Sequence, residues 1–131
     1  SRARRYVHIL TPYLIIDHNM ETALQYAAER GVDVHLILPG IPDKKYAFAL
    51  AHTHYASLMK AGVKISEYTP GFVHAKECAA YMLDVPCIAD IEADFQHTLK
   101  QCRRMTPERL KNDKLSMKVA GALLKAIAPL M

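Results

Sequence analysis

The sequence lacks the features that tie a chain together covalently or carry it through a membrane. Its 131 residues include three cysteines, an odd number without CxxC spacing, so neither a disulfide framework nor a zinc site is expected. No apolar run approaches the roughly 20 residues that span a bilayer, and no apolar signal-peptide core follows the basic start at residues 1–5. We therefore predict a chain that does not cross a membrane by itself and that resides in a reducing compartment.

A large excess of charge of either sign is also lacking. Seventeen Lys and Arg residues against thirteen Asp and Glu give a formal net charge of +4, which favours anionic partners such as phosphate groups, acidic lipids or nucleic acid without choosing among them. With 51% apolar and 23% charged residues, the composition predicts one compact domain rather than a disordered chain. The chain also lacks an initiator methionine and opens directly into a strand, which indicates the interior of a longer protein.

What is present is an alternation of strand and helix signals. Short β-type runs are predicted at residues 6–10, 32–38 and 63–68. Between them, one helix is expected to start at the N-cap Asp17 and end at Gly31, and a second to run from the loop at 39–43 to Gly62. Because strands that alternate with helices need crossover connections, these residues predict an α/β fold with a parallel sheet, helices on its faces and a site beyond the carboxyl ends of the strands.

The second half of the chain predicts a further strand candidate at 77–83 and a helix over 89–103. A last helix is expected to begin at Thr106-Pro107, with proline at its first position. The segment 106–131 places its apolar residues at helical spacing and its Lys and Arg residues between them. Such a basic amphipathic helix either docks on the domain with its charges solvated, which periodicity alone favours, or lies on an anionic membrane surface.

His74 and Lys76 carry the most chemical information in the chain. They are two residues apart on what reads as a strand, so both side chains point to the same face. An imidazole attacks or shuttles a proton near neutral pH, and a lysine stabilises negative charge on phosphate oxygens, so the pair suits phosphoryl chemistry. Taken alone, such a pair is common, and a strand histidine is more often a packing residue than a catalyst.

Several stretches around this pair resemble the carboxy-terminal half of the phospholipase D superfamily, and most closely bacterial cardiolipin synthases. The matching pieces occur in the family's order: Thr11-Pro12-Tyr13-Leu14, Arg30-Gly31-Val32-Asp33-Val34, Pro42-Asp43, Ala61-Gly62-Val63-Lys64-Ile65, Tyr68-Thr69-Pro70-Gly71-Phe72, the His-x-Lys pair and Ala128-Pro129-Leu130. The resemblance implies a phospholipase D-like domain with a mixed sheet and helices on both faces. It also implies that residues 1–131 form a single domain in the carboxy-terminal half of a longer protein.

The resemblance implies a reaction as well. In that superfamily two HxKxxxxD motifs, one in each half, build one active site without metal or cofactor. One histidine attacks phosphorus to form a phosphohistidine, and the other, here His74, acts as acid and base while Lys76 holds the phosphate oxygens. For cardiolipin synthases, a phosphatidyl group passes from one phosphatidylglycerol to another and glycerol is released. Tyr13 is a further candidate, either contacting lipid or phosphate at the site mouth or capping the core with its hydroxyl in water.

Partners and location follow from the same resemblance. The implied substrate is phosphatidylglycerol, and the implied partners are the amino-terminal half of the same protein or a second chain, together with an anionic membrane surface. The implied location is the cytoplasmic face of a bacterial cell membrane, with these 131 residues themselves soluble. Nucleic acid is not expected as a partner, because the basic residues are scattered evenly rather than gathered along a groove.

The sequence departs from the family pattern after the lysine. The family's aspartate would fall at position 81, which is Tyr81, and a Gly-Thr/Ser-x-Asn segment is absent, as if a piece had been removed between Lys76 and Glu77. Losing that piece would leave a strand edge with unsatisfied amides, so unrecorded residues are a better explanation than natural shortening. The 131 residues alone are expected to be inactive. The alternatives are another phosphodiesterase or nuclease of the superfamily, or a non-catalytic interaction domain with a degenerate motif.

Two further groups of residues are expected to be structurally ordinary. His52 and His54 are two apart on a predicted helix and do not face each other, so they are predicted to be surface histidines rather than a metal site. Cys78, Cys87 and Cys102 are predicted to be small buried apolar residues.

Overall fold

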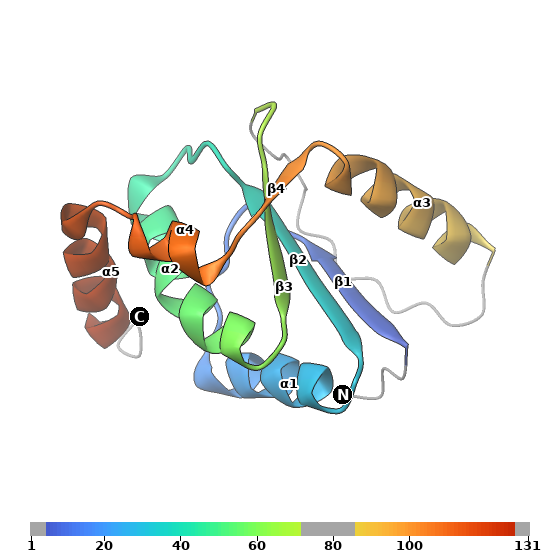
Figure 1. Cartoon of the computed structure of the whole chain (residues 1–131), viewed down its shortest axis with the longest axis horizontal. Coiled ribbons are helices and arrows are strands. Elements are labelled where there is room, and N and C mark those ends of the chain that lie inside the picture. The colour runs from blue at the N-terminus through green and yellow to red at the C-terminus, as the bar shows by residue number, and fades with distance from the viewer. Residues whose placement is uncertain (1–4, 72–85, 128–131) are drawn as a thin grey trace.

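The computed structural model of the chain describes residues 5–71 and 86–127. The strands are β1 (Tyr6–Leu10), β2 (Asp33–Pro39), β3 (Lys64–Tyr68) and β4 (Cys102–Arg104), and they form one sheet in that order. The helices are α1 (His18–Glu29), α2 (Lys45–Lys60), α3 (Cys87–Leu99), α4 (Pro107–Lys111) and α5 (Leu115–Ile127). β1, β2 and β3 are parallel and β4 is antiparallel to β3, so the predicted α/β fold with a mixed sheet is confirmed (Figure 1).

The crossover helices begin and end where local chemistry predicts. Asp17 caps α1 by accepting a hydrogen bond of 2.8 Å from the Met20 backbone amide, which satisfies one of the free amides of the first turn. Gly31 and Gly62 follow α1 and α2 with φ of 85° and 96°, a conformation that glycine adopts without steric cost. Each glycine turns the chain directly into the next parallel strand.

The main apolar core lies between the sheet and the helices α1 and α2. Because side chains alternate along a strand, one face of β2 and β3 points into this core while the other faces α3. The core residues from these four elements include Val34, Leu36, Leu38, Ile65, Leu24, Ala27, Tyr55 and Leu58. The face that α1 and α2 cover is therefore the apolar one.

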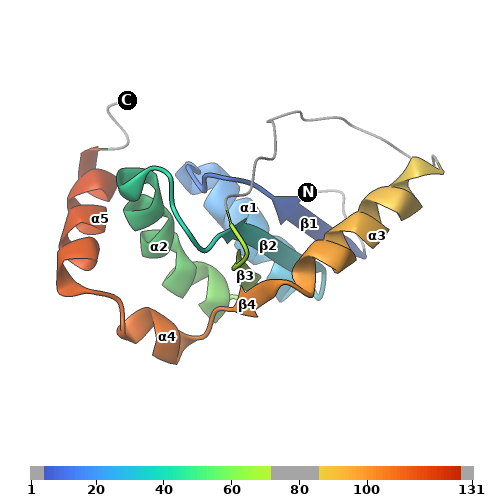
Figure 2. The same cartoon turned by 90° about the horizontal axis from the view of Figure 1, so that it is seen from above.

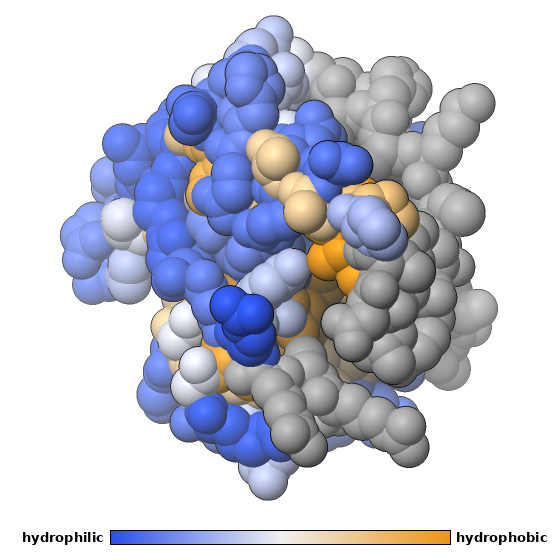
Figure 3. All heavy atoms as spheres, turned by 90° about the vertical axis from the view of Figure 1, so that its right-hand side faces the viewer, coloured by the Kyte–Doolittle hydropathy of each residue, from blue (hydrophilic) through white to orange (hydrophobic). Residues whose placement is uncertain are grey.

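The opposite face of the sheet is covered by α3. Phe95 of α3 is 7% exposed, and its ring stacks on His8 of β1 with 4.5 Å between centroids. Figure 2 shows α2 and α3 on opposite sides of the strands, so the prediction of helices on both faces is confirmed. Seen from the side that carries α3, most of the described surface is hydrophilic (Figure 3).

α5 packs against the outer side of α2 and adds a further layer (Figure 1). A Cβ at Gly121 would lie 2.5 Å from the carbonyl oxygen of Ala49 and 2.7 Å from Cγ2 of Thr53. Glycine at this position therefore permits the close approach of the two helices. Within the described ranges, no helix combines the length and the apolar character needed to cross a bilayer.

The structure differs from the predicted helix over 89–103. α3 begins at Cys87 and ends at Leu99, and the chain then enters β4, where Arg103 is the register partner of Glu67. The backbone amide of Met105 continues this pairing with a hydrogen bond of 2.9 Å to the Ile65 carbonyl. Residues 102–105 pair with backbone groups at the edge of β3, and the helical spacing of apolar residues in the sequence gives no sign of this pairing.

The last predicted helix is divided into α4 and α5. Thr106 caps α4 and Pro107 is its first residue, as predicted. The helix stops at Lys111, and Asp113 in the following turn accepts a hydrogen bond from His52 of α2. The side chain of His52, which is distant in sequence, therefore helps to stabilise the turn between α4 and α5. The strand predicted at 77–83 lies outside the described residues.

Candidate functional site

The carboxyl ends of β1, β2 and β3 lie along one edge of the sheet, because these strands are parallel. The loop after β2 is held against the end of β3 by a hydrogen bond of 2.8 Å from the Gly40 amide to the Tyr68 carbonyl oxygen. A Cβ at Gly40 would lie 2.8 Å from that same oxygen, so a larger residue would push the two segments apart. This edge is the position at which sheets of this type commonly bind ligands.

Tyr13 lies at this edge, directly after β1. Its hydroxyl donates a hydrogen bond of 2.6 Å to the Asp43 carboxylate in the loop after β2, and the Lys44 ammonium lies 5.1 Å from the centroid of its ring. The Thr11 hydroxyl donates to the Tyr13 carbonyl oxygen at 2.9 Å and shapes the turn after the strand. Tyr13 is thus placed where the sequence predicts a site mouth, with its hydroxyl on a carboxylate.

The two predicted catalytic residues, His74 and Lys76, lie outside the described residues. In sequence, they follow β3, whose carboxyl end lies at this edge. After β3, the amide and hydroxyl of Thr69 both donate to the Gln101 carbonyl oxygen, at 3.3 and 2.8 Å. The last described residue before them, Gly71, is two residues further on. Tyr81 and Cys78 also lie outside the described residues.

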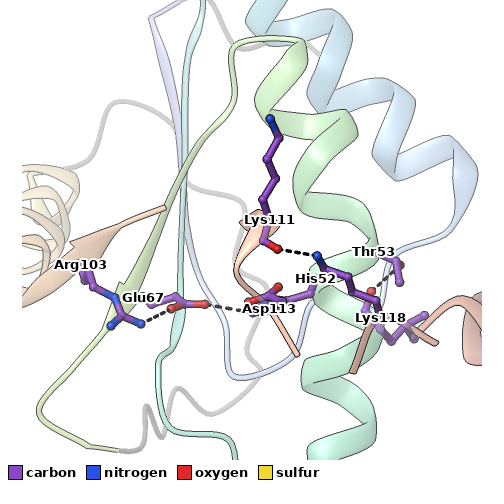
Figure 4. Close-up of polar contacts among 8 residues, drawn as sticks. His52, Thr53, Glu67, Arg103, Lys111, Asp113 and Lys118 are labelled. Atoms are coloured by element: carbon purple, nitrogen blue, oxygen red, sulfur yellow. Dashed lines mark hydrogen bonds and ion pairs between the residues drawn. The ribbon is translucent and has the colours of Figure 1, made fainter. Parts of the chain in front are cut away.

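A chain of charged side chains, buried at His52 and Glu67, runs from β4 through β3 and α2 to the turn before α5 (Figure 4). His52 donates from Nε2 to Glu67 Oε1 at 3.1 Å and from Nδ1 to Asp113 Oδ2 at 2.7 Å. The second oxygen of Glu67 accepts from Arg103 at 3.0 Å. His52 is 8% exposed and Glu67 2%. Because both ring nitrogens face carboxylate oxygens, the geometry requires the protonated imidazolium.

The electrostatics of His52 agree with this geometry. Burial disfavours the charged ring, but hydrogen bonds and Coulomb attraction from Glu67 and Asp113 outweigh burial and raise the pKa of His52 above its ordinary value. Its positive charge therefore persists at a pH where an exposed histidine would be neutral. Since both Glu67 oxygens already accept hydrogen bonds, this carboxylate is a structural group rather than an available base.

A cavity of about 340 Å³ opens beside this chain of charges. Its lining combines the loop after β2 with basic and acidic side chains: Gly40, Phe48, His52, Glu67, Arg103, Met105, Arg109, Asn112 and Asp113. Gly40 belongs to the carboxyl edge of the sheet, so the cavity adjoins the edge that holds Tyr13. Its size and polar lining suit a small polar group.

His54 forms a separate buried pair on another side of α2. Its Nδ1 donates to Glu21 of α1 at 2.9 Å, and the Ser57 hydroxyl donates to the same carboxylate. Burial of Glu21 favours its neutral form, but the bonds from Ser57 and His54 outweigh this and lower the pKa of Glu21. The prediction that His52 and His54 are surface histidines is wrong, because α2 is covered on several sides. The prediction that they do not face each other is confirmed.

Sequence reasoning also missed a polar cluster under α3. His8 and His35 are register partners on β1 and β2. His8 donates from Nδ1 to Glu92 of α3 at 2.7 Å, whereas His35 shares a hydrogen bond of 2.9 Å with the Ser66 hydroxyl. Burial and the Arg104 charge lower the pKa of His35 to about 4, so it is neutral at physiological pH. The sequence does contain a signal for this cluster, because His8 and His35 each interrupt an apolar run within a strand.

The cysteines show one further difference from the prediction. Cys87 at the start of α3 is exposed rather than buried. Cys102 in β4 is half-buried, and burial raises the pKa of its thiol, so the unreactive thiol form is favoured there.

Comparison with known proteins gives a family match. Residues 1–82 match the family model described as the cardiolipin synthase, PLD-like domain. An uncharacterized protein of Streptococcus mutans is 50% identical over the whole chain, which covers 34% of that protein. Cardiolipin synthase 2 of Bacillus anthracis is 29% identical and a cardiolipin synthase of Clostridium perfringens 30%, again over the whole chain and over 30% and 33% of their own lengths. No solved structure gives a significant match.

Two facts about these relatives bear on the site. The chain spans about a third of the length of the relatives it matches. Each alignment extends over 156 positions, against 131 residues in this chain, so the relatives contain residues that have no counterpart here.

Proposed function

Because the chain belongs to the family of the cardiolipin synthase PLD-like domain, we propose that it supplies the carboxy-terminal half of a phosphatidyltransferase site in a longer protein. The reaction transfers a phosphatidyl group from one phosphatidylglycerol to a second and releases glycerol. The observation that carries this proposal is the family match, which extends over residues 1–82 and so includes His74 and Lys76.

In this proposal, His74 moves protons while a histidine from the other half attacks phosphorus. A phosphohistidine forms, the bond from phosphorus to the glycerol oxygen breaks, and His74 gives its proton to that oxygen. The hydroxyl of a second phosphatidylglycerol then passes its proton to His74 and attacks phosphorus, which releases the nucleophilic histidine and completes cardiolipin. Lys76 stabilises the negative charge on the non-bridging oxygens in both steps.

Tyr13 would take part in holding the substrate. It lies after β1 at the edge from which the chain continues toward His74, and its hydroxyl is bonded to Asp43. We infer that this phenol contacts the phosphate or glycerol part of the lipid. The Asp43 bond would limit the orientations of the ring before substrate arrives.

The proposal requires partners. A second HxK-bearing half, from the same protein or from a second chain, would supply the nucleophile. The lipid substrate would bring the protein to an anionic membrane surface, which for this family we place at the cytoplasmic face of a bacterial cell.

The test is cardiolipin formation from phosphatidylglycerol vesicles by the longer protein that contains this chain. His74→Ala is expected to lower the rate about 100- to 10,000-fold, the usual contribution of a general acid or base. His18→Ala, which changes an exposed histidine at the start of α1, is the matched control and is expected to leave the rate unchanged. Equal rates for His74→Ala and the unmodified protein would contradict the proposal.

A non-catalytic interaction domain is the second candidate. Two observations favour it: Tyr81 stands where the family motif has aspartate, and the relatives contain residues that this chain lacks. Mass spectrometry of chymotryptic peptides from the purified protein separates the candidates. A peptide with the mass of the printed sequence from Val73 to Tyr81 would support the degenerate domain, whereas extra residues after Lys76 would support the enzyme.

A further inference from the structure

The outer side of α5 is apolar and exposed. Leu115, Val119 and Leu123 are spaced four residues apart, so they follow one line along the helix. Their exposed fractions are 76%, 52% and 62%. The opposite side of the helix is buried against α2, where Gly121 meets Ala49. α5 is therefore apolar toward the protein and apolar toward solvent.

A helix with one packed face normally carries polar residues on the other. An exposed apolar stripe opposite the packed face, which α5 has despite the lysines on its flank, is typical of a helix with an apolar phase on both sides. On the outer side of α5, the exposed Ala122 and Ala126 continue the line of larger apolar residues and add no polar group. This outer face, Leu115, Val119 and Leu123 with the two alanines, is the surface that requires a covering partner.

The charges around this outer face are positive. The sequence of α5 contains no Asp or Glu. Lys114, Lys118 and Lys125 follow one flank of the helix, and all three are exposed. The Lys118 ammonium donates to the Lys111 carbonyl oxygen at 2.7 Å, which fixes this flank relative to α4. A partner that covers the apolar line would thus meet a row of ammonium groups beside it.

One carboxylate reaches this row, since Glu21 of α1 lies 4.0 Å from the Lys125 ammonium, whereas the acidic residue nearest in sequence does not face it. Asp113, in the turn before α5, is turned inward and accepts a hydrogen bond from His52. α4 adds the exposed Arg109 and Lys111 to the same end of the molecule. A second copy of the chain would bring another row of lysines and no carboxylate from its own α5, so charge favours an anionic partner.

We propose that the outer face of α5 rests on an anionic lipid bilayer. The helix lies parallel to the membrane plane, with Leu115, Val119 and Leu123 at the boundary between head groups and acyl chains and the lysine flank beside the lipid phosphates. The proposal deepens the proposed function by naming the surface through which the domain meets its lipid. Binding of this kind involves neither His74 nor Lys76, so it can be tested apart from catalysis.

The chain offers a direct probe, because it contains no tryptophan. Val119→Trp places a single indole in the middle of the outer face. With vesicles of equal parts phosphatidylglycerol and phosphatidylcholine, its emission is expected to shift to the blue and to be quenched by brominated lipids. Ile91→Trp, at a residue of α3 that is 55% exposed, is the matched control and is expected to show neither change.

Vesicle binding of variants separates the two parts of the interaction. Leu115→Ser with Leu123→Ser is expected to weaken binding at least tenfold, and Lys114→Gln with Lys118→Gln about 25-fold, since each lysine near an anionic surface contributes about fivefold. The controls are Met20→Ser with Ile91→Ser and Lys45→Gln with Lys100→Gln, which change exposed residues on other helices or, for Lys100, directly after one. Circular dichroism verifies the fold of each variant, and His74→Ala is expected to bind as the unmodified chain does.

Three outcomes would overturn the proposal. The first is an unshifted indole at saturating phosphatidylglycerol. The second is equal binding to vesicles of phosphatidylcholine alone. The third is a blue shift that needs no vesicles and grows with protein concentration, which would assign the outer face to a second copy of the chain. Loss of cardiolipin synthesis in His74→Ala with unchanged vesicle binding would leave both proposals standing.

Discussion

The two faces of the sheet bury histidines in opposite charge states. On the side of α2, His52 lies between two carboxylates and is positively charged. On the side of α3, His35 is packed beside Phe95 and hydrogen-bonded to a neutral hydroxyl, and it is uncharged at physiological pH. Both residues are buried histidines, with exposed fractions of 8% for His52 and 6% for His35. The partner groups therefore decide the charge of a buried imidazole.

The helices on the two faces differ in a related way. α2 lies between the sheet and α5, so its charged pairs are covered on several sides. α3 covers the sheet but leaves its own outer side open, with Ile91 55% exposed. We expect changes on the α2 side to cost more stability than equivalent changes on the α3 side.

Removing the central carboxylate on the α2 side has the largest expected effect. Glu67→Gln leaves the His52 imidazolium and the Arg103 guanidinium without their shared anion, which is expected to cost about 3–5 kcal/mol. Urea unfolding measures this loss. Glu92→Gln on the α3 side, where the carboxylate is 27% exposed, is expected to cost about 1 kcal/mol. Equal losses would remove the distinction between the two faces.

The pH dependence of stability is expected to have opposite signs for His35 and His52. Since the folded pKa of His35 is lowered to about 4, its contribution is present above the unfolded pKa near 6.5 and is lost as pH falls from there toward 4. The loss is expected to be about 3 kcal/mol and to be absent in His35→Gln. Unfolding midpoints in urea at several pH values between 7 and 4 would measure it.

The contribution of His52 to stability changes with pH in the opposite direction. Its folded pKa is raised, so its contribution is fully present below the unfolded pKa near 6.5 and is lost as pH rises through the folded value. Above pH 6.5 the unmodified chain is expected to lose stability relative to His52→Gln. If His35→Gln and His52→Gln changed the stability over the same pH range, the contrast between the two histidines would be refuted.

A smaller loss of stability is expected when a side chain is added between α2 and α5. Gly121→Ala places a methyl group within 2.5 Å of the Ala49 carbonyl oxygen and is expected to destabilise the chain by about 1–3 kcal/mol. Thermal unfolding by circular dichroism is the measurement. Gly71→Ala is the control, since a Cβ there has no atom within 4 Å. A similar loss in both variants would point to helix or turn propensity instead of contact.

The smallest loss of stability is expected for Tyr13, which lies at the carboxyl edge of the sheet rather than on either face. Tyr13→Phe removes the 2.6 Å hydrogen bond to Asp43 and is expected to cost about 1 kcal/mol or less, because the bond is exposed. A double-mutant cycle with Asp43→Asn measures the coupling. A large stability loss would assign Tyr13 to the core and count against a contact with substrate.

Much of the fold was predictable because its signals are local. The cap at Asp17 and the glycines at 31 and 62 mark helix ends through their own backbone chemistry, and the structure confirms all three. The Tyr13 position at the sheet edge followed from strand direction alone. The predicted catalytic pair, His74 and Lys76, stays a prediction, since both lie outside the described residues.

The sequence by itself determined the alternation of strands and helices and the edge at which Tyr13 lies, because spacing, caps and left-handed glycines act within a few residues. Only the tertiary structure decided the burial of His52, His54 and His35, the charge of His52 and His35, the strand β4 and the break before α5. Each depends on groups far away in the chain, such as Glu67 and Asp113 for His52. Distance in space, which sets desolvation and pairing, is not encoded in the local pattern.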